Sequence, residues 1–487
     1  MGRLKILLTA NVILGLAALP TASSVAQSQN CPADPTPDPP ALTFGAPSYI
    51  STTQAGGEPV SIVAQDGSIL VSTHAGTTHV YKDPNALPGA GDFVDGYTDQ
   101  TLNFRSTDDG NTWTYVGLNG QPAGPHTITS SGFSDPDYAM DSGGRIYNTE
   151  INLANDSVYS SSDDGQSFPV GNPVAGNGDR PWLTGQDPGV VYLYINSTPN
   201  HYLQKSTDGG ITFSTVTSSF PATGKLYNDP LNFHNGLIGP DGNAGITISQ
   251  DNGVTWKEYK GAKLSPATEF FGAPMAVDKA GWIYTAAAGG YQDATDTKAD
   301  GKVSFAYFNR QTQKWNSKEI DIPTPEGDAL WAWVTAGSDG RAAVTWYQSL
   351  KGKPNEFYVY VAQTLNAHGT TVDCDNGTTK TYPPKFSVVN ASGRPIHVGQ
   401  ICLNGTNCNA STSFQGGDRR LGDFFTVNYD LQGRLFIASA DTRLTSPTGG
   451  PKPVSNPIFI RQNDGSPMLD VPTKARPTRA LCDLPTC

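Results

Sequence analysis

Four copies of one eight-residue pattern, Ser-x-Asp-x-Gly-x-Thr/Ser-Trp/Phe, constrain the fold more than any other feature of this sequence. The copies begin at Ser106, Ser161, Ser206 and Ser249, with spacings of 55, 45 and 43 residues. A hairpin-sized motif that recurs at this period is typical of a radial or linear array of four-stranded sheets. The sequence therefore predicts an all-β repeat protein.

The chemistry of this octapeptide suits a tight turn. Its Asp carboxylate can accept hydrogen bonds from backbone N–H groups, and its Gly can take a positive φ that other residues resist. Its hydroxyl residue can tie the hairpin, and its aromatic ring can pack between neighbouring sheets. We therefore expect a structural role, on the outer rim of the molecule, for the four aspartates of the pattern, Asp108, Asp163, Asp208 and Asp251.

A second repeat underlies the octapeptides: an apolar strand, a turn of the form Asp-x-Gly or Asp-x-x-Gly, and another strand. Its seven copies begin at Pro59, Pro136, Pro181, Pro230, Pro274, Trp333 and Phe425. The first four copies each lead into an octapeptide hairpin, so an inner and an outer hairpin make up one unit. Such a unit is one blade of a β-propeller. The count favours seven four-stranded blades.

The octapeptide is similar to the Asp-box, or BNR repeat, and the chain resembles the sialidase-like β-propellers from about Pro59 to Gln462. The resemblance implies a secreted propeller that acts on glycans, with six blades as the alternative count. True sialidases carry their first arginine in a Tyr/Phe-Arg-Ile-Pro motif, where this chain has Gly57. The neighbouring Glu58 would also repel a substrate carboxylate. We therefore do not expect sialidase activity proper.

Five segments are expected along the chain. Residues 1–26 read as a secretory signal, because Arg3 and Lys5 precede an apolar run that ends before a small-residue cleavage site. Residues 27–45 are expected to be a Pro-rich tether, residues 46–465 the propeller, and residues 466–487 a C-terminal tail. Residues 365–417 are expected to be a Cys-containing loop insertion. The protein is thus predicted to be secreted, or periplasmic in a Gram-negative host.

The cysteines agree with an oxidising compartment. None of them shows the spacing of metal ligands, so disulfides are favoured over zinc. The six candidates are Cys31, Cys374, Cys402, Cys408, Cys482 and Cys487. Six cysteines allow 15 pairings. We expect a small loop closed by Cys402–Cys408 and a tie between the chain termini that involves Cys31.

Net charge and hydropathy limit the kinds of partner that this chain can bind. The net charge is −12 and no Lys/Arg cluster occurs, which argues against nucleic-acid binding. Outside the signal no apolar run approaches the length of a membrane span. A monomer is expected, and six Asn-x-Ser/Thr sequons would carry glycans in a eukaryotic host.

Candidate functional residues lie just before the inner strands, because these strands line the channel of a propeller and begin at one face. Carboxylates are the candidates for catalysis: Asp135, Asp137, Asp179, Asp229 and Glu269. Arginines, aromatics and further polar residues are the candidates for substrate binding: Glu58, Tyr138, Arg180, Trp182, His234, Trp331, Arg420 and Asp423. Paired carboxylates suit glycoside hydrolysis, and arginines grip carboxylates by paired hydrogen bonds. Arg419 and Trp333 belong to the same group of residues.

Three hypotheses follow. The first is a glycoside hydrolase of sialidase-like fold with paired carboxylates in the central funnel. The second is a propeller that binds glycan or protein without catalysis. The third is a polysaccharide lyase, with Tyr138 or His234 as the base. No cofactor is required, although a structural calcium ion between Asp135, Asp179 and Asp229 is compatible with these side chains. Signatures of serine hydrolases, zinc proteases and nucleotide-binding enzymes are absent.

Overall fold

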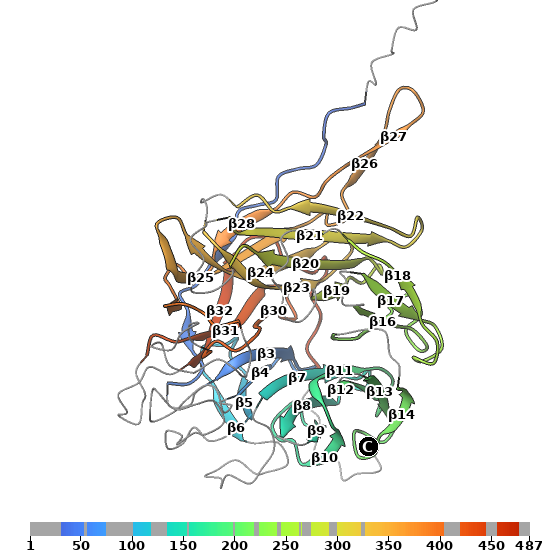
Figure 1. Ribbon diagram of the computed structural model, residues 1–487, viewed down its shortest axis with the longest axis vertical. Helices are drawn as coiled ribbons and strands as arrows, with labels where there is room; N and C mark the ends of the chain where they lie inside the picture. Colours follow the sequence, from blue (N-terminus) through green and yellow to red (C-terminus); the bar gives the residue numbers. More distant parts are fainter. Residues whose placement is uncertain are drawn as a thin grey trace, which may run out of the picture.

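The computed structural model is an all-β ring of seven blades (Figure 1). It describes residues 31–52, 56–74, 101–117, 134–152, 155–197, 200–218, 224–240, 245–262, 264, 274–291, 300–322, 327–403, 419–444 and 455–476. The seven-blade prediction is confirmed, and the six-blade alternative is wrong. No helix in this part of the chain is long and apolar enough to cross a membrane.

The first four blades carry the octapeptides, and each is a four-stranded antiparallel sheet whose strands follow one another in sequence. Blade 1 has β3 (Gly57–Val63), β4 (Ile69–His74), β5 (Thr101–Ser106) and β6 (Thr114–Gly117). Blade 2 has β7 (Ser134–Met140), β8 (Ile146–Asn152), β9 (Asn155–Ser161) and β10 (Val170–Gly176). Blade 3 has β11 (Asp179–Gly185), β12 (Val191–Ser197), β13 (Asn200–Ser206) and β14 (Ser214–Thr217). Blade 4 has β15 (Tyr227–Asn228), β16 (Leu237–Pro240), β17 (Ile246–Ser249) and β18 (Lys257–Tyr259).

The last three blades lack the octapeptide. Blade 5 has β19 (Met275–Val277), β20 (Ile283–Gly289), β21 (Lys302–Asn309) and β22 (Lys314–Glu319). Blade 6 has β23 (Ala329–Ala336), β24 (Ala342–Leu350), β25 (Lys353–Thr364) and β28 (Ser387–Asn390), with β29 (His397–Val398) also paired to β25. Blade 7 has β30 (Thr426–Tyr429), β31 (Leu435–Asp441) and β32 (Asn456–Asp464).

The start of the chain completes blade 7. Strands β1 (Thr43–Phe44) and β2 (Ser48–Tyr49) both pair antiparallel with β32. Pairing between the two ends of the chain closes the ring and covers the edge that β32 would otherwise expose. The expected boundary of the tether at residue 45 therefore falls within this closure.

The octapeptides form the turns between the third and fourth strands of blades 1–4, as expected for the outer rim. In the first copy, Ser106 Oγ donates to Asp108 at 2.8 Å and Thr112 Oγ1 donates to the other carboxylate oxygen at 2.6 Å. The same bonds recur at Asp163, Asp208 and Asp251. Each aspartate therefore ties its own turn.

The octapeptide glycines allow neighbouring blades to approach closely. Gly165 has φ +79°, and a Cβ on it would lie 2.1 Å from Leu70 Cδ2 of blade 1. Gly110 has φ +83°, and a Cβ there would lie 2.2 Å from Phe459 Cε1 of blade 7. Only glycine combines this backbone with this contact. The octapeptide thus joins blades as well as closing a hairpin.

The expected loop insertion at 365–417 is wrong in part, because Ser387–Asn390 forms the fourth strand of blade 6. Before it, β26 (Thr370–Asp373) and β27 (Thr379–Tyr382) form a hairpin that projects from the ring beside the N-terminal segment (Figure 1). We call this hairpin the arm. Lys385 at its base lies 3.1 Å from Asp38 and 3.6 Å from Asp34, which fastens the N-terminal segment to it.

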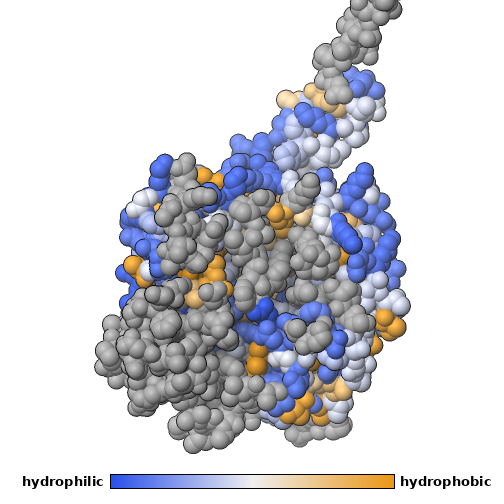
Figure 2. Space-filling model, viewed as in Figure 1, coloured by the Kyte–Doolittle hydropathy of each residue, from blue (hydrophilic) through white to orange (hydrophobic). Residues whose placement is uncertain are grey.

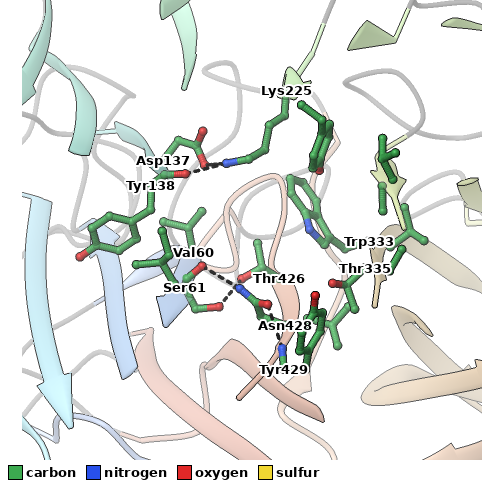
Figure 3. Close-up of a pocket in the computed structure, with 17 residues that line it drawn as sticks. Val60, Ser61, Asp137, Tyr138, Lys225, Trp333, Thr335, Thr426, Asn428 and Tyr429 are labelled. Atoms are coloured by element: carbon green, nitrogen blue, oxygen red, sulfur yellow. Dashed lines mark hydrogen bonds and ion pairs between the residues drawn. The ribbon is translucent and has the colours of Figure 1, made fainter. Parts of the chain in front are cut away.

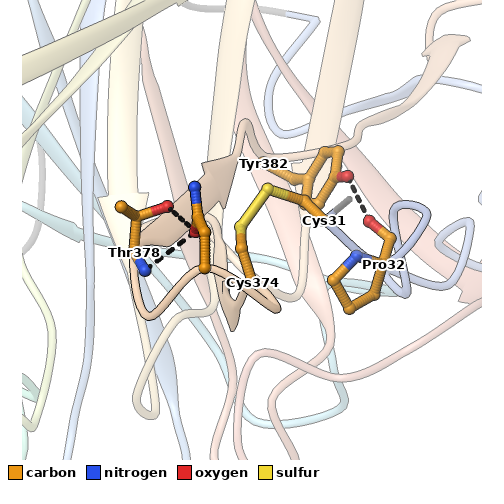
Figure 4. The surroundings of a disulfide bond; sticks show 6 residues. Cys31, Pro32, Cys374, Thr378 and Tyr382 are labelled. Carbon is orange, nitrogen blue, oxygen red and sulfur yellow. Dashed lines mark hydrogen bonds between the residues drawn. A yellow bond between two sulfur atoms is a disulfide. The ribbon is translucent and has the colours of Figure 1, made fainter. Parts of the chain in front are cut away.

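Cys31 forms a disulfide with Cys374 of the arm (Figure 4). The expected tie between the termini through Cys31 is therefore wrong, because the arm brings Cys374 alongside the N-terminal segment. Tyr382 Oη donates to the Pro32 carbonyl at 2.5 Å next to the disulfide. Cys402 is also disulfide-bonded, whereas Cys408, Cys482 and Cys487 lie outside the described residues, as do the expected signal and the Cys402–Cys408 pairing.

The C-terminal segment runs along the turns that follow the inner strands of three blades. Its backbone bonds reach Ser338 of blade 6, Gly433 and Leu431 of blade 7, and Gln65 of blade 1. Figure 2 shows a largely hydrophilic described surface on one face of the molecule. The exposed large hydrophobic residues are scattered over separate elements: Val174, Ile211, Leu231, Val254, Val398 and Val471.

Candidate functional site at the channel

Four inner strands begin with the same backbone irregularity. Strands β3, β7, β11 and β23 each shift register near their start, and the residue at the shift has a positive φ. These residues are Glu58 (47°), Asp135 (49°), Arg180 (54°) and Trp331 (53°). Such a backbone costs about 1–3 kcal/mol for a residue other than glycine and persists only where neighbours hold it. The four blades therefore present four different side chains from one equivalent position.

Glu58 ties blades 1, 2 and 7 together. One of its carboxylate oxygens accepts from the Asp423 backbone N–H at 2.9 Å. The other lies 2.8 Å from His74 Nε2 and accepts from the Asp135 backbone N–H at 3.3 Å. The side chains of Glu58 and His74 are almost fully buried, so this carboxylate acts as an internal anchor instead of a ligand group.

Burial alone would raise the pKa of Glu58, but the charge and hydrogen bond of His74 outweigh it, helped by Asp135 and Arg419, and lower the pKa. Asp135 behaves in the opposite way. Burial raises its pKa well above the ordinary value, and the negative charges of Glu58 and Asp179 add to the effect, against Arg180. The pKa values of the two neighbouring carboxyl groups are thus shifted in opposite directions, the arrangement from which acid and base roles arise.

Asp179 and Arg180 extend this group toward solvent. The Asp179 side chain is 54% exposed, and Arg180 lies 3.7 Å from it and 3.9 Å from Asp423. Asp423 also forms an ion pair with the buried Arg419. We call these seven residues the charged cluster: Glu58, His74, Asp135, Asp179, Arg180, Arg419 and Asp423.

Three aromatic side chains follow the charged cluster along the inner strands. Trp182 lies two residues after Arg180, and Phe424 directly follows Asp423. The ring centroids of Trp182 and Phe424 are 5.4 Å apart, and Trp333 lies 6.0 and 5.9 Å from these two rings. These three rings form an aromatic plug beneath the charged cluster. Trp182 is therefore a packing residue, and Trp331 is likewise buried, against Tyr347.

The side chains of Asp137 and Tyr138 bind residues outside the charged cluster. Asp137 forms an ion pair with Lys225 and accepts from the Leu183 backbone N–H at 2.8 Å. Burial raises the pKa of Asp137, although Lys225 opposes the shift. The Tyr138 hydroxyl donates to Asn103 at 2.5 Å. Neither residue joins the charged cluster.

Asp229 and His234 lie at the opposite end of the inner strands. Strand β15 ends before Asp229, whose carboxylate tucks into the following turn and binds Arg310 at 2.6 and 2.7 Å. His234 lies in the same turn, 2.7 Å from Asp187. The expected start of this blade at Pro230 is wrong, because the inner strand has only two residues and its pattern was too short to fix the register.

The remaining candidates do not enlarge the cluster. Arg420 is buried and donates to the Thr442 carbonyl at 2.9 Å, and Glu269 lies outside the described residues. Asp229 lies at the other end of the channel from Asp135 and Asp179, so the structure does not bring these three aspartates together. Within the described ranges, no group of three His, Cys, Asp or Glu side chains is arranged to hold a metal ion.

Sequence reasoning missed three residues of this region. His74 ends the second strand of blade 1, and nothing in its local sequence marks it. Phe424 directly precedes the repeat copy that begins at Phe425, and nothing in the local sequence places it in the channel. Lys225 could have been found as a basic residue just before an inner strand, had the start of blade 4 been placed correctly.

No protein-family model matches this sequence, and no curated protein matches it either. Solved structures with a similar fold include a xyloglucanase from Xanthomonas campestris, at 12% identity and a TM-score of 0.47, covering 84% of this chain and 55% of the xyloglucanase. The chain thus spans about half the length of that protein. A fungal alcohol oxidase in complex with copper has 12% identity and a TM-score of 0.48, with coverage of 88% and 77%.

A leech intramolecular trans-sialidase is similar at 11% identity and a TM-score of 0.39, with coverage of 88% of this chain and 70% of that protein. At these identities and TM-scores the likeness carries no argument about activity.

Proposed function

We propose that the protein is a secreted, carbohydrate-active propeller that hydrolyses a glycosidic bond at the charged cluster. The observation that supports this proposal is the pair Asp135 and Asp179, from adjacent blades, beside the guanidinium of Arg180. Asp135 keeps its proton to a higher pH than an ordinary carboxyl group, whereas Asp179 is exposed to solvent. Glycoside hydrolysis uses one carboxylic acid that still holds its proton and a second carboxylate.

In this proposal Asp135 protonates the glycosidic oxygen of the leaving group. Asp179 acts on the opposite side of the sugar ring, either on the anomeric carbon or on a water molecule. Arg180 holds Asp179 and hydrogen-bonds to the substrate. Export is supported by the Cys31–Cys374 disulfide, since such bonds persist in oxidising compartments.

A screen of fluorogenic glycosides tests the proposal, with Asp135→Asn and Asp179→Asn as the active-site variants. We expect each variant to lose roughly 10²–10⁴-fold in kcat, the usual contribution of a positioned acid or base. Asp187→Asn is the matched control, because this carboxylate lies beside His234 at the far end of the channel. Proton NMR of the first-formed product then shows whether the configuration is retained or inverted.

A glycan-binding propeller without catalysis is the second candidate, and the aromatic plug favours it because three packed rings lie in the channel next to the cluster. A glycan array with the same variants separates the two functions. Binding without hydrolysis, lost in Asp179→Asn and Arg180→Ala, would support the second candidate. If the protein shows neither glycan binding nor hydrolysis, both candidate functions are contradicted.

A further inference from the structure

A cavity of about 320 Å³ lies in the channel, and its walls come from the inner strands of blades 1, 2, 4, 5, 6 and 7 (Figure 3). Its polar lining residues are Ser61, Asp137, Lys225, Tyr227, Thr335, Thr426, Asn428 and Tyr429, and its aromatic wall includes Trp333. Ligand pockets span about 300–1,000 Å³. This channel cavity is therefore large enough for one small molecule, and too small for an oligosaccharide.

The channel cavity is separate from the charged cluster. The inner strands run from the cluster, past the aromatic plug, to the cavity: in blade 6 the order is Trp331, Trp333 and Thr335, and in blade 7 it is Asp423, Phe424 and Asn428. The plug thus lies between the two regions. Thr335, Asn428 and Tyr429 are only half-buried, so solvent can reach this part of the cavity.

The lining offers hydrogen-bonding groups without net charge. The ammonium of Lys225 and the carboxylate of Asp137 neutralise each other, and Lys225 also donates to the Tyr138 carbonyl at 2.8 Å. A charged ligand that contacts this pair would be attracted by one of its two charges and repelled by the other. The side chains of this pair therefore select for no ion of either sign.

Three hydroxyl groups in the wall remain available. Within the part of the chain that the structure describes, Tyr227, Thr335 and Tyr429 make no side-chain hydrogen bond. Burial raises the pKa of the Tyr429 hydroxyl to about 12, so it stays a neutral donor at physiological pH. The half-buried Trp333 adds an aromatic face, on which the C–H face of a sugar ring can pack.

We propose that the channel cavity binds one neutral monosaccharide or cyclic polyol, at a site separate from the charged cluster. The hydroxyls of Tyr227, Thr335 and Tyr429 exchange hydrogen bonds with the hydroxyls of the ligand, and Trp333 covers its apolar face. A ring ligand of this kind matches the volume, the neutrality and the unpaired hydroxyls together. The proposal does not depend on hydrolysis at the charged cluster.

Isothermal titration calorimetry on the full chain tests the site, with D-glucose, D-galactose and myo-inositol as probes and D-glucuronate and D-glucosamine as charged comparators. We expect at least one neutral probe to bind with a stoichiometry of one, and more tightly than either charged comparator. Trp333 lies in the wall, so tryptophan emission should change on binding, and Trp333→Phe should remove that change.

Thr335→Val and Tyr429→Phe should each weaken binding roughly three- to tenfold, because each removes one hydrogen bond to the ligand. Thr371→Val on the arm is the matched control, and Asp179→Asn tests the charged cluster; both should bind as the wild type does. A thermal melt of each variant checks that it is folded. Absence of binding by every neutral probe would overturn the proposal. So would binding that is lost in Asp179→Asn and unchanged in the folded cavity variants, since the ligand would then lie at the charged cluster.

Discussion

The outer rim of this propeller, formed by the octapeptide turns, and its hub, where the inner strands begin, each contain four equivalent positions. The rim and the hub differ in which features recur from blade to blade. At the rim, the octapeptide turns repeat sequence, backbone and hydrogen bonds together. At the hub, the four shifted residues share only their backbone, and their side chains are Glu58, Asp135, Arg180 and Trp331. The octapeptide side chains recur because each of them stabilises its turn. The unlike side chains on one repeated backbone at the hub are what a binding or catalytic site needs.

The largest effect is expected at the hub. Glu58→Leu removes one partner of a buried ion pair and leaves His74 without its carboxylate. We expect a loss of about 3–5 kcal/mol in the free energy of unfolding, measured by urea denaturation. Glu319→Gln is the control, because its pair with Lys302 is about half exposed and contributes about 1 kcal/mol or less. Equal stability of the two variants would contradict the anchoring role of Glu58.

The second effect concerns the contact between rim and neighbouring blade. Gly165→Ala places a Cβ against Leu70 and should cost about 1–3 kcal/mol for overpacking, in addition to about 1 kcal/mol for the positive φ. Gly352→Ala is matched to it, because Gly352 has φ +76° but no atom within 4 Å of the added Cβ. The difference in free energy of unfolding between the two variants, measured by urea denaturation, gives the cost of the contact between the added Cβ and Leu70. If they lose the same stability, the glycine is needed only for its backbone.

The third prediction tests a buried carboxyl group next to the hub. Burial raises the pKa of Asp156 to about 8, the charge of Asp179 adds to this, and the nearby Gly178 backbone opposes it. Neither of its carboxyl oxygens has a hydrogen-bond partner within normal distance among the described residues. The folded protein therefore keeps this proton up to about pH 8, whereas the unfolded chain releases it near its ordinary pKa of 3.8.

Because the folded state holds the extra proton, the Asp156 contribution lowers stability as pH rises from about 4 to about 8. Asp156→Asn removes this contribution. The stability of the variant relative to the wild type should thus increase between pH 5 and pH 8, by up to about 1.4 kcal/mol for each pH unit, as followed by urea denaturation at each pH. Asp321→Asn, at an exposed carboxylate, should show no such trend. A parallel pH dependence of wild type and Asp156→Asn would contradict the raised pKa.

The smallest effect tests the equivalence of the rim turns. Thr112→Val, Thr212→Val and Thr255→Val each remove the same 2.6 Å hydrogen bond to the octapeptide aspartate. Each should cost about 1 kcal/mol or less, because the bond is exposed. Thermal melts of the three variants should shift by similar amounts. Clearly unequal shifts in melting temperature would show that the same hydrogen bond contributes differently to stability in different blades.

The rim could be predicted from sequence, and the hub only in part, for a physical reason. The Asp of an octapeptide bonds within its own turn, and the Gly supplies the positive φ of that turn, so a local pattern is sufficient to place Asp108 or Gly110. The hub is assembled by contacts between blades. Glu58 and Asp135 were identified as candidates because they precede inner strands, yet the anchoring of Glu58 depends on His74 and on the Asp423 backbone, far away in the sequence.

Blade 4 shows where the pattern fails. Its inner strand, Tyr227–Asn228, is too short to carry an alternating pattern, so the sequence places Asp229 just before an inner strand, whereas it directly follows one. The same misplacement hid Lys225, which reaches across to Asp137. Long inner strands could be placed from their periodicity, and the short one required the packing of its neighbours.

Closure of the ring by β1 and β2 has a consequence for biosynthesis. Ser48 is made early, yet its partner Phe459 follows 411 residues later. Six complete sheets and most of a seventh must be synthesised before the ring can close, and until then β1 and β2 have no partner strand. A fusion partner or purification tag attached directly ahead of Cys31 would begin at the arm, which projects from the ring (Figure 1).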